Sequence, residues 1–102
     1  MGDDYTLIEA NMGEVSRSEV LNRFRTLQPN WDGYNADAPR SAVIDLAQEL
    51  VSLMETILPD NARDSLIVLP ARHGGIQLEW NDGDHEHEVG IEPDGSLEFL
   101  HT

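Results

Sequence analysis

PRSAVIDLAQELVSLMETIL, residues 39–58, is the only stretch of this chain that is long and apolar enough to be the spine of a core. Its apolar residues recur at steps of three and four positions, and this period predicts one amphipathic helix. The apolar positions are Val43, Leu46, Ala47, Leu50, Met54, Ile57 and Leu58. Pro39 suits a first helical turn, Asp37 can cap the helix or favour its positive end, and Pro59 ends it. The rest of the chain should cover this apolar stripe.

A shorter helix is predicted upstream of this segment. Ser16 and Glu19 have the spacing of a capping box, and an apolar stripe follows until Pro29. The stripe consists of Val20, Leu21, Phe24 and Leu27, and the opposite side carries Arg17, Arg23 and Arg25. These arginines are expected either to pair weakly with acids of the long helix on a solvated surface or to hold a partner's carboxylate. Residues 1–14 are expected to form a loose arm, in which residues 5–8 could be a short strand.

The composition is that of one small acidic domain. The chain has 102 residues, with twenty aspartates and glutamates, six arginines, no lysine and a formal net charge of −14. Such a surface repels phosphate backbones and anionic membranes, and it attracts a basic protein partner. Cysteine is absent, which excludes disulfides, thiol nucleophiles and thiolate metal sites. No apolar run approaches the roughly 20 residues that cross a bilayer, so we expect a cytoplasmic protein.

The connector between the two helices, residues 29–39, is rich in glycine, proline and polar residues and contains two aromatic side chains. It is predicted to be an ordered loop rather than a helix or a strand. Two interpretations remain open. Trp31 and Tyr34 could form a binding platform, since such side chains are favoured anchors at interfaces. Alternatively, they could fold over the helix ends as a plug that seals the core, with Asp32 capping a turn.

Beyond the long helix the hydrophobic period changes from that of a helix to that of a strand, which predicts a turn over residues 60–65 and then a sheet. The predicted strands are residues 66–69, 76–80, 85–92 and 97–100. Asp82-Gly83 predicts a two-residue hairpin turn, and EPDGS at residues 92–96 predicts a turn with a glycine bulge. The fold class is therefore α+β in two layers, with two antiparallel helices (residues 16–58) packed on a four-stranded antiparallel β-meander (residues 65–101).

These turns imply a register for the sheet and therefore the composition of its two faces. The facing pairs are Trp80 and His85, Leu78 and His87, Ile76 and Val89, Ile91 and Leu97, and Val89 and Phe99. Their side chains should lie on the helices. The opposite face then carries a set of carboxylates: Glu79, Glu86, Glu88, Glu92 and Glu98. We interpret this set either as a rigid carboxylate lattice that docks on a basic surface, such as a partner's nucleic-acid site, or as an ordinary solvated face.

The same register gathers His85, His87 and His101 near one end of the inward face, with His73 on the preceding turn. Alternate residues on a strand can place two imidazoles on one ion, so a zinc site is one interpretation, and histidines that border the core are the other. The sequence contains no phosphate loop, zinc-binding helix motif or nucleophile elbow, so we expect neither an enzyme nor a bound cofactor.

Two tryptophan-containing motifs, NWDGY at residues 30–34 and GGIQLEW at residues 74–80, occur together with Ala38-Pro39 and with EPDG at residues 92–95. This combination resembles a pattern in small acidic bacterial and phage-associated proteins, and the resemblance covers residues 30–100. It implies a cytoplasmic prokaryotic domain from an accessory or defence-related cassette, and it supplies no catalytic residues. His73 departs from the pattern, in which an acidic or polar residue is expected before the double glycine.

The sequence therefore favours a non-enzymatic protein-binding module, an inhibitor or antitoxin-like protein that docks its carboxylate face on a basic protein. Trp31 and Tyr34 would add an apolar anchor. A metal- or ligand-binding sensor that uses the histidines is one alternative. A self-associating domain is another, because the last strand, residues 97–100, offers an edge that could pair with a second copy. The chain would then be a homodimer rather than a monomer.

Overall fold

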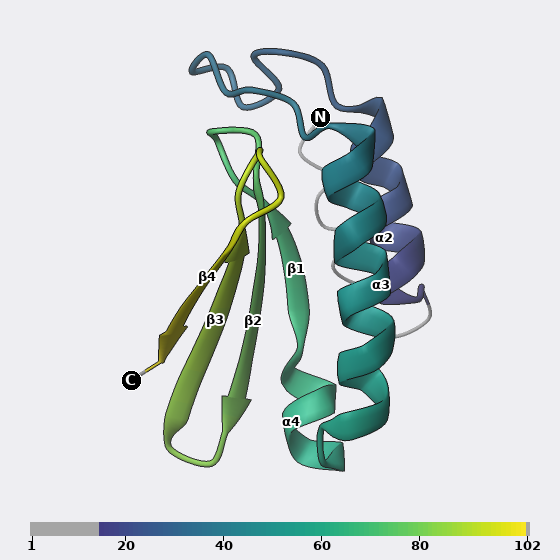
Figure 1. Ribbon diagram of the computed structural model, residues 1–102, viewed down its shortest axis with the longest axis vertical. Coiled ribbons are helices and arrows are strands. Elements are labelled where there is room, and N and C mark those ends of the chain that lie inside the picture. Colours follow the sequence, from purple (N-terminus) through teal and green to yellow (C-terminus); the bar gives the residue numbers. More distant parts are fainter. Residues whose placement is uncertain (1–14, 102) are drawn as a thin grey trace.

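Helices cover one face of a four-stranded sheet, so the molecule has two layers (Figure 1). The computed structural model describes residues 15–101, apart from the side chain of His101. In chain order the elements are α2 (Arg17–Arg23), the 3-10 helix η1 (Phe24–Thr26), α3 (Ser41–Ile57), α4 (Asp60–Ser65), β1 (Ile67–Pro70), β2 (Ile76–Asp82), β3 (His85–Ile91) and β4 (Leu97–His101). The antiparallel strands lie in the order β1-β2-β3-β4, which confirms the predicted α+β fold with a meander. The predicted arm and the strand at residues 5–8 lie outside the described residues.

The helices α2 and α3 begin in different ways. At the start of α2 the Ser16 hydroxyl accepts a hydrogen bond from the Glu19 N–H at 3.0 Å, as the capping box predicts. At the start of α3 the N-cap residue is Arg40, and no side chain caps the helix. The predicted cap by Asp37 is wrong, because Asp37 lies too far upstream and its backbone is held in a bridge with His73.

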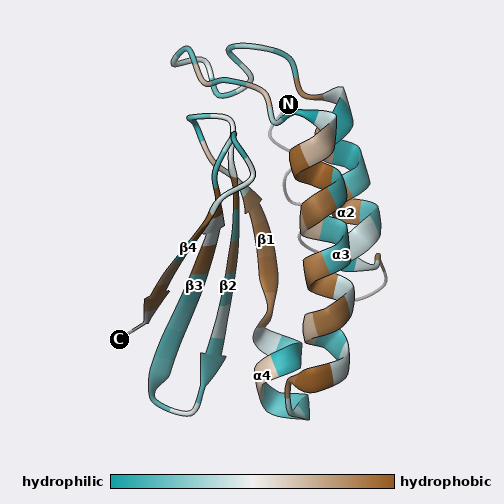
Figure 2. Ribbon diagram, in the orientation of Figure 1, coloured by the Kyte–Doolittle hydropathy of each residue, from teal (hydrophilic) through white to brown (hydrophobic). Residues whose placement is uncertain are grey.

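Apolar side chains of the helices and the sheet meet in one core. The buried residues of α3 are Val43, Ile44, Ala47, Val51 and Met54, and the sheet adds Val68, Ile76, Leu78, Trp80, Val89 and Ile91. This stripe of α3 is rotated slightly from the predicted one, because Leu46 and Leu50 are only partly buried and Ile57 is 67% exposed. Figure 2 shows hydrophobic residues along β1 and at intervals along α3, whereas the hairpin between β2 and β3 is largely hydrophilic.

The short helix α4 occupies the segment that the sequence predicts as a turn. Ala62 is fully buried in the core, so a short helix here adds apolar contacts that a solvated turn would lack. Arg17 of α2 stabilises this segment through hydrogen bonds. Its Nε donates to the Leu66 carbonyl at 2.7 Å, and another nitrogen of its guanidinium donates to the Arg63 carbonyl. The same guanidinium pairs with Glu55 of α3 at 2.8 Å.

The register of the sheet agrees with the prediction at one hairpin and differs at the other. Between β3 and β4, Ile91 faces Leu97 as predicted. Between β2 and β3 the turn falls at Gly83-Asp84, so Trp80 faces His87 rather than His85. The pairing is therefore shifted by two residues, and an even shift leaves every side chain on its predicted face.

The helices do not cover the whole inward face of the sheet. Val89 and Ile91 of β3 are buried, but Leu97 and Phe99 of β4, which share their face, are 56% and 63% exposed. The expectation that this entire face lies on the helices is therefore wrong for β4, because the helical layer packs over β1 to β3 and ends there. Figure 1 shows β4 at the side of the sheet farthest from α3.

Candidate functional site

Four carboxylates occupy the face of the sheet that points away from the helices. We call them the acidic face, and they are Glu79, Glu86, Glu88 and Glu98. Glu79 of β2 lies directly opposite Glu88 of β3, and residues opposed in this way have Cβ atoms about 5 Å apart. Glu86 follows roughly 7 Å along the same strand, because a strand rises about 3.4 Å per residue. The four side chains therefore form a compact array on a rigid backbone.

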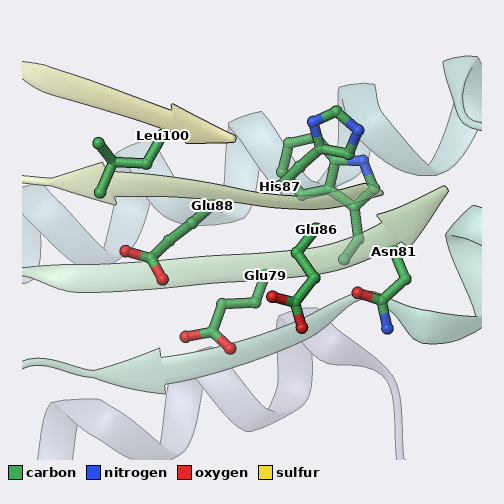
Figure 3. A pocket seen from close by; sticks show the side chains of 7 residues that line it. Glu79, Asn81, Glu86, His87, Glu88 and Leu100 are labelled. Carbon is green, nitrogen blue, oxygen red and sulfur yellow. The ribbon is translucent and has the colours of Figure 1, made fainter. Parts of the chain in front are cut away.

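Burial and repulsion by neighbouring carboxylates act on the pKa of one member of the acidic face. Burial raises the pKa of the Glu79 carboxyl above its ordinary value of 4.5, and the charges of Glu88 and Glu86 and a hydrogen bond with Glu88 raise it further. Figure 3 shows the carboxylates of Glu79, Glu86 and Glu88 close together beside a shallow pocket of about 230 Å³. A cation brought to this pocket would relieve the repulsion.

Four of the six arginines form ion pairs with carboxylates outside the acidic face. Within residues 15–101 no ion pair joins an arginine to the acidic face. The arginine pairs are Arg17 with Glu55, Arg25 with Asp45, Arg63 with Asp60 and Arg72 with Asp32. The predicted pairing between arginines of the first helix and acids of the long helix is thus confirmed for Arg17 and Arg25, and it leaves the sheet carboxylates with their negative charge.

Glu92, which the sequence places with these carboxylates, has a different role. Its side chain pairs with the His73 imidazole and joins the β1–β2 turn to the β3–β4 turn. Glu92 therefore lies at the end of the sheet near these turns, where it lines a hollow together with Glu88 and Glu98 and already has His73 as a partner.

A second hollow, of about 160 Å³, opens over Gly90 on the same face. Gly90 lies between Gln77 of β2 and Glu98 of β4, and Glu88 lines the hollow as well. A Cβ added at Gly90 would meet no atom closer than 3.9 Å, so neither the backbone nor the packing requires glycine there. The one signal for this residue in the sequence is that an isolated glycine within a strand often marks a close approach by another group.

Glu79→Gln should raise the free energy of unfolding at neutral pH by about 0.5 kcal/mol, because it removes a charge that directly opposes Glu88. The folded protein holds the Glu79 proton at higher pH than the unfolded chain does, so the charge destabilises the fold above the raised pKa. This destabilisation disappears as the pH falls through that pKa. Urea unfolding at several pH values would measure both effects.

Glu49→Gln is the matched control, since Glu49 is exposed on α3 and loses the same charge. Its unfolding curve should keep the pH dependence of the parent protein. If Glu79→Gln kept it as well, the proposed repulsion in the acidic face would be wrong.

The loop between the helices presents one aromatic side chain to solvent. Tyr34 is 76% exposed, so the interpretation of this residue as a core plug is wrong. Trp31 is half-buried, and its indole N–H donates to the Asp37 carbonyl at 2.8 Å. Neither belongs to the core cluster, and both lie at the end of the molecule near the β1–β2 turn rather than beside the acidic face.

Asp32 holds this loop in shape. One oxygen of its carboxylate accepts hydrogen bonds from the N–H groups of Tyr34 at 2.8 Å and Ala36 at 3.1 Å, and the other accepts from Arg72 at 2.6 Å. Burial alone would raise the pKa of the Asp32 carboxyl, but the bonds from Tyr34, Ala36 and Arg72 outweigh it and lower the pKa. The predicted turn cap is therefore present. Its partner Arg72 lies forty residues away, and local patterning gives no sign of that contact.

The histidines lie at two ends of the sheet. His87 faces His101 across β3 and β4, and its ring stacks on Trp80 with centroids 5.2 Å apart. His85 lies at the β2–β3 turn, whereas His73 lies on the β1–β2 turn, as predicted, which is at the opposite end of the sheet beside Glu92. The stacking fits the interpretation of His87 as a residue at the border of the core. The described side chains contain no group of three or more His, Asp or Glu suited to a metal ion.

Comparison of the chain with protein-family models, with curated proteins and with solved structures gave no match. The resemblance of its tryptophan motifs to small bacterial and phage-associated proteins therefore stays a prediction. Within residues 15–101 no helix is both long and apolar enough to cross a membrane.

Proposed function

We propose that this chain is a non-enzymatic binding protein that docks its acidic face on a basic surface of a partner protein. One observation carries the proposal: carboxylates of three neighbouring strands gather on one rigid surface, and no arginine within residues 15–101 pairs with them. Repulsion among these carboxylates lowers the stability of the free protein, and a cationic surface that covers them removes this repulsion.

The sign of the charge selects the class of partner. A net charge of −14 opposes approach to nucleic acids and anionic membranes, whereas it speeds encounter with a basic protein. If that basic surface is the partner's own nucleic-acid site, the bound chain would block it, which is the inhibitor or antitoxin-like role that we propose.

Reversal of two charges on the acidic face tests this proposal. The double variant Glu86→Lys, Glu88→Lys should bind a short synthetic peptide of alternating arginine and valine at least roughly tenfold more weakly than the parent protein. Affinity of the parent protein should also fall steeply between low and high salt, because the contacts are charged and solvent-exposed. Fluorescence anisotropy of the labelled peptide measures both quantities.

The double variant Glu49→Lys, Asp64→Lys is the matched control. Both residues are exposed and lie on the helical layer, and the net charge changes by the same amount. It should lose only the small part of the affinity that depends on total charge. Equal losses in the two double variants would mean that the acidic face is an ordinary solvated surface, and the proposed function would be wrong.

A further inference from the structure

We propose that the basic partner binds through an extended segment that adds as a fifth strand to the outer edge of β4, which pairs only with β3 among the described strands. The segment would alternate basic residues, which lie over the acidic face, with apolar residues, which lie beside Phe99 on the other face. This inference rests on the proposed function and specifies the kind of partner that the acidic face receives.

The backbone of β4 presents hydrogen-bonding groups along its outer edge. At the β3–β4 turn the Glu92 N–H donates to the Ser96 carbonyl at 2.8 Å, which makes these two residues a hydrogen-bonded pair. Such pairs alternate along an antiparallel ladder, so Leu97 and Phe99 form non-hydrogen-bonded pairs with β3. Their N–H and C=O groups therefore point away from β3, toward the edge, and among the described elements only β3 pairs with β4.

The side chains of β4 suit a partner of mixed character. On the inward face Leu97 and Phe99 are more than half exposed, and the Phe99 ring meets Trp80 edge-on with centroids 6.1 Å apart. On the outward face Glu98 lies at the edge, and Glu88 lies one strand further in, opposite Leu100. A strand paired here would meet apolar surface with one set of alternate side chains, and with the other set it would meet Glu98 and the half-exposed Leu100, with Glu88 one strand further in.

The opposite edge of the sheet is less suited to strand addition. β1 has only four residues, and the last of them, Pro70, lacks an N–H. α2 also lies against β1, where Arg17 already donates to the carbonyl of Leu66 just before the strand. Short strands, proline and covering elements are features that keep a sheet edge from pairing.

Charge decides between a basic segment and a second copy of this chain at the β4 edge. Two copies that paired there would each bring a net charge of −14, and each would bring Glu98 to the interface. A segment with arginine or lysine at alternate positions would instead be attracted to Glu98 at this edge. The exposed apolar side chains of β4 could pack on a basic segment or on a second copy equally well, so charge is the deciding difference.

The test compares two synthetic peptides of identical composition, one that alternates arginine and valine and one that has the arginines and valines in separate blocks. We expect the alternating peptide to bind about tenfold more tightly, since only it presents both side-chain patterns at once. Hydrogen exchange of the Leu97 and Phe99 amides should be fast in the free protein and should slow on binding.

Two variants at one position test the backbone contact. Phe99→Pro removes an N–H that points to the edge, which a sheet edge tolerates, whereas Phe99→Ala keeps the N–H and loses the ring. The proline variant should bind the alternating peptide roughly threefold to tenfold more weakly than the alanine variant. If the proline variant unfolds, the exchange of the two amides in the parent protein decides the matter.

Three results would overturn strand addition. These are equal affinity for the two peptides, no slowing of the Leu97 and Phe99 amides on binding, and amides that are already slow in the free protein because the edge is covered. A mass that doubles with concentration in light scattering would assign the edge to a second copy. In each case, if Glu86→Lys, Glu88→Lys still weakened peptide binding more than the control double variant did, the proposed function would stand. If the two double variants weakened binding equally, the proposed function would be wrong as well.

Discussion

Gly75→Ala should lower the free energy of unfolding by about 3 kcal/mol, because the fold leaves no room for a methyl group at this position. A Cβ on Gly75 would collide with the Ile91 carbonyl oxygen and would lie 3.0 Å from the His73 imidazole. The imidazole can rotate away, but the carbonyl belongs to the backbone of β3. Relief therefore requires β2 to move away from β3 where Ile76 and Ile91 pair at the centre of the core.

Gly90→Ala is the matched control, because it adds the same methyl group to the same sheet. No atom lies closer than 3.9 Å to the added Cβ, so this change should leave stability unchanged or raise it by up to about 1 kcal/mol. Urea unfolding monitored by circular dichroism would measure both variants. A loss of stability at Gly75 no larger than the change at Gly90 would refute the steric argument.

Arg17→Met should lower the free energy of unfolding by about 2 kcal/mol, since it removes two hydrogen bonds from a charged donor, one to the Leu66 carbonyl and one to the Arg63 carbonyl, which keeps only its bond from the Leu66 N–H. The Arg17 guanidinium reaches the carbonyls of Arg63 and Leu66, which belong to the end of α4 and the residue after it. Its side chain is 22% exposed, so water has limited access to the groups it satisfies. Methionine keeps the apolar stem and removes only the donors.

Glu55→Gln separates these hydrogen bonds from the ion pair of the same arginine. The pair between Arg17 and Glu55 spans 2.8 Å, but Glu55 is 36% exposed, and pairs of this kind contribute less than about 1 kcal/mol. The glutamine variant should therefore unfold close to the parent protein in a thermal melt. If it lost as much stability as Arg17→Met, the ion pair rather than the carbonyls would hold α4.

Elements with strong local patterns could be predicted from the sequence. The spacing of apolar residues along α3 and the capping box at Ser16 depend on neighbours in the chain, and both helices are where they were expected. The turn at Glu92 to Ser96 fixed the register of β3 against β4 for the same reason. Near Gly83 the turn can fall at either of two positions that shift the register by two residues. Both put every side chain on the same face of the sheet, so the local pattern could not distinguish them.

Features that depend on contacts between distant segments could not be predicted. α4 is too short to have a detectable period, and its formation depends on the burial of Ala62 and on Arg17. The alternation of side chains along the strands predicted which carboxylates lie on the acidic face. The pairing of Glu92 with His73 depends on the β1–β2 and β3–β4 turns lying side by side, which no local pattern indicates. The exposure of Phe99 depends on how far the helical layer extends, and a single strand contains no information about that extent.

The meander order of the sheet has a consequence for how the chain folds. Each strand pairs with the strand that follows it in sequence, so every pairing in the sheet closes only a short loop. Chains dominated by such local pairings fold faster than sheets of similar size with crossover connections, typically within milliseconds for mixed helix and strand domains. Folding should therefore be rapid, and the apolar side chains of the strands would be exposed to wrong partners only briefly before the core closes.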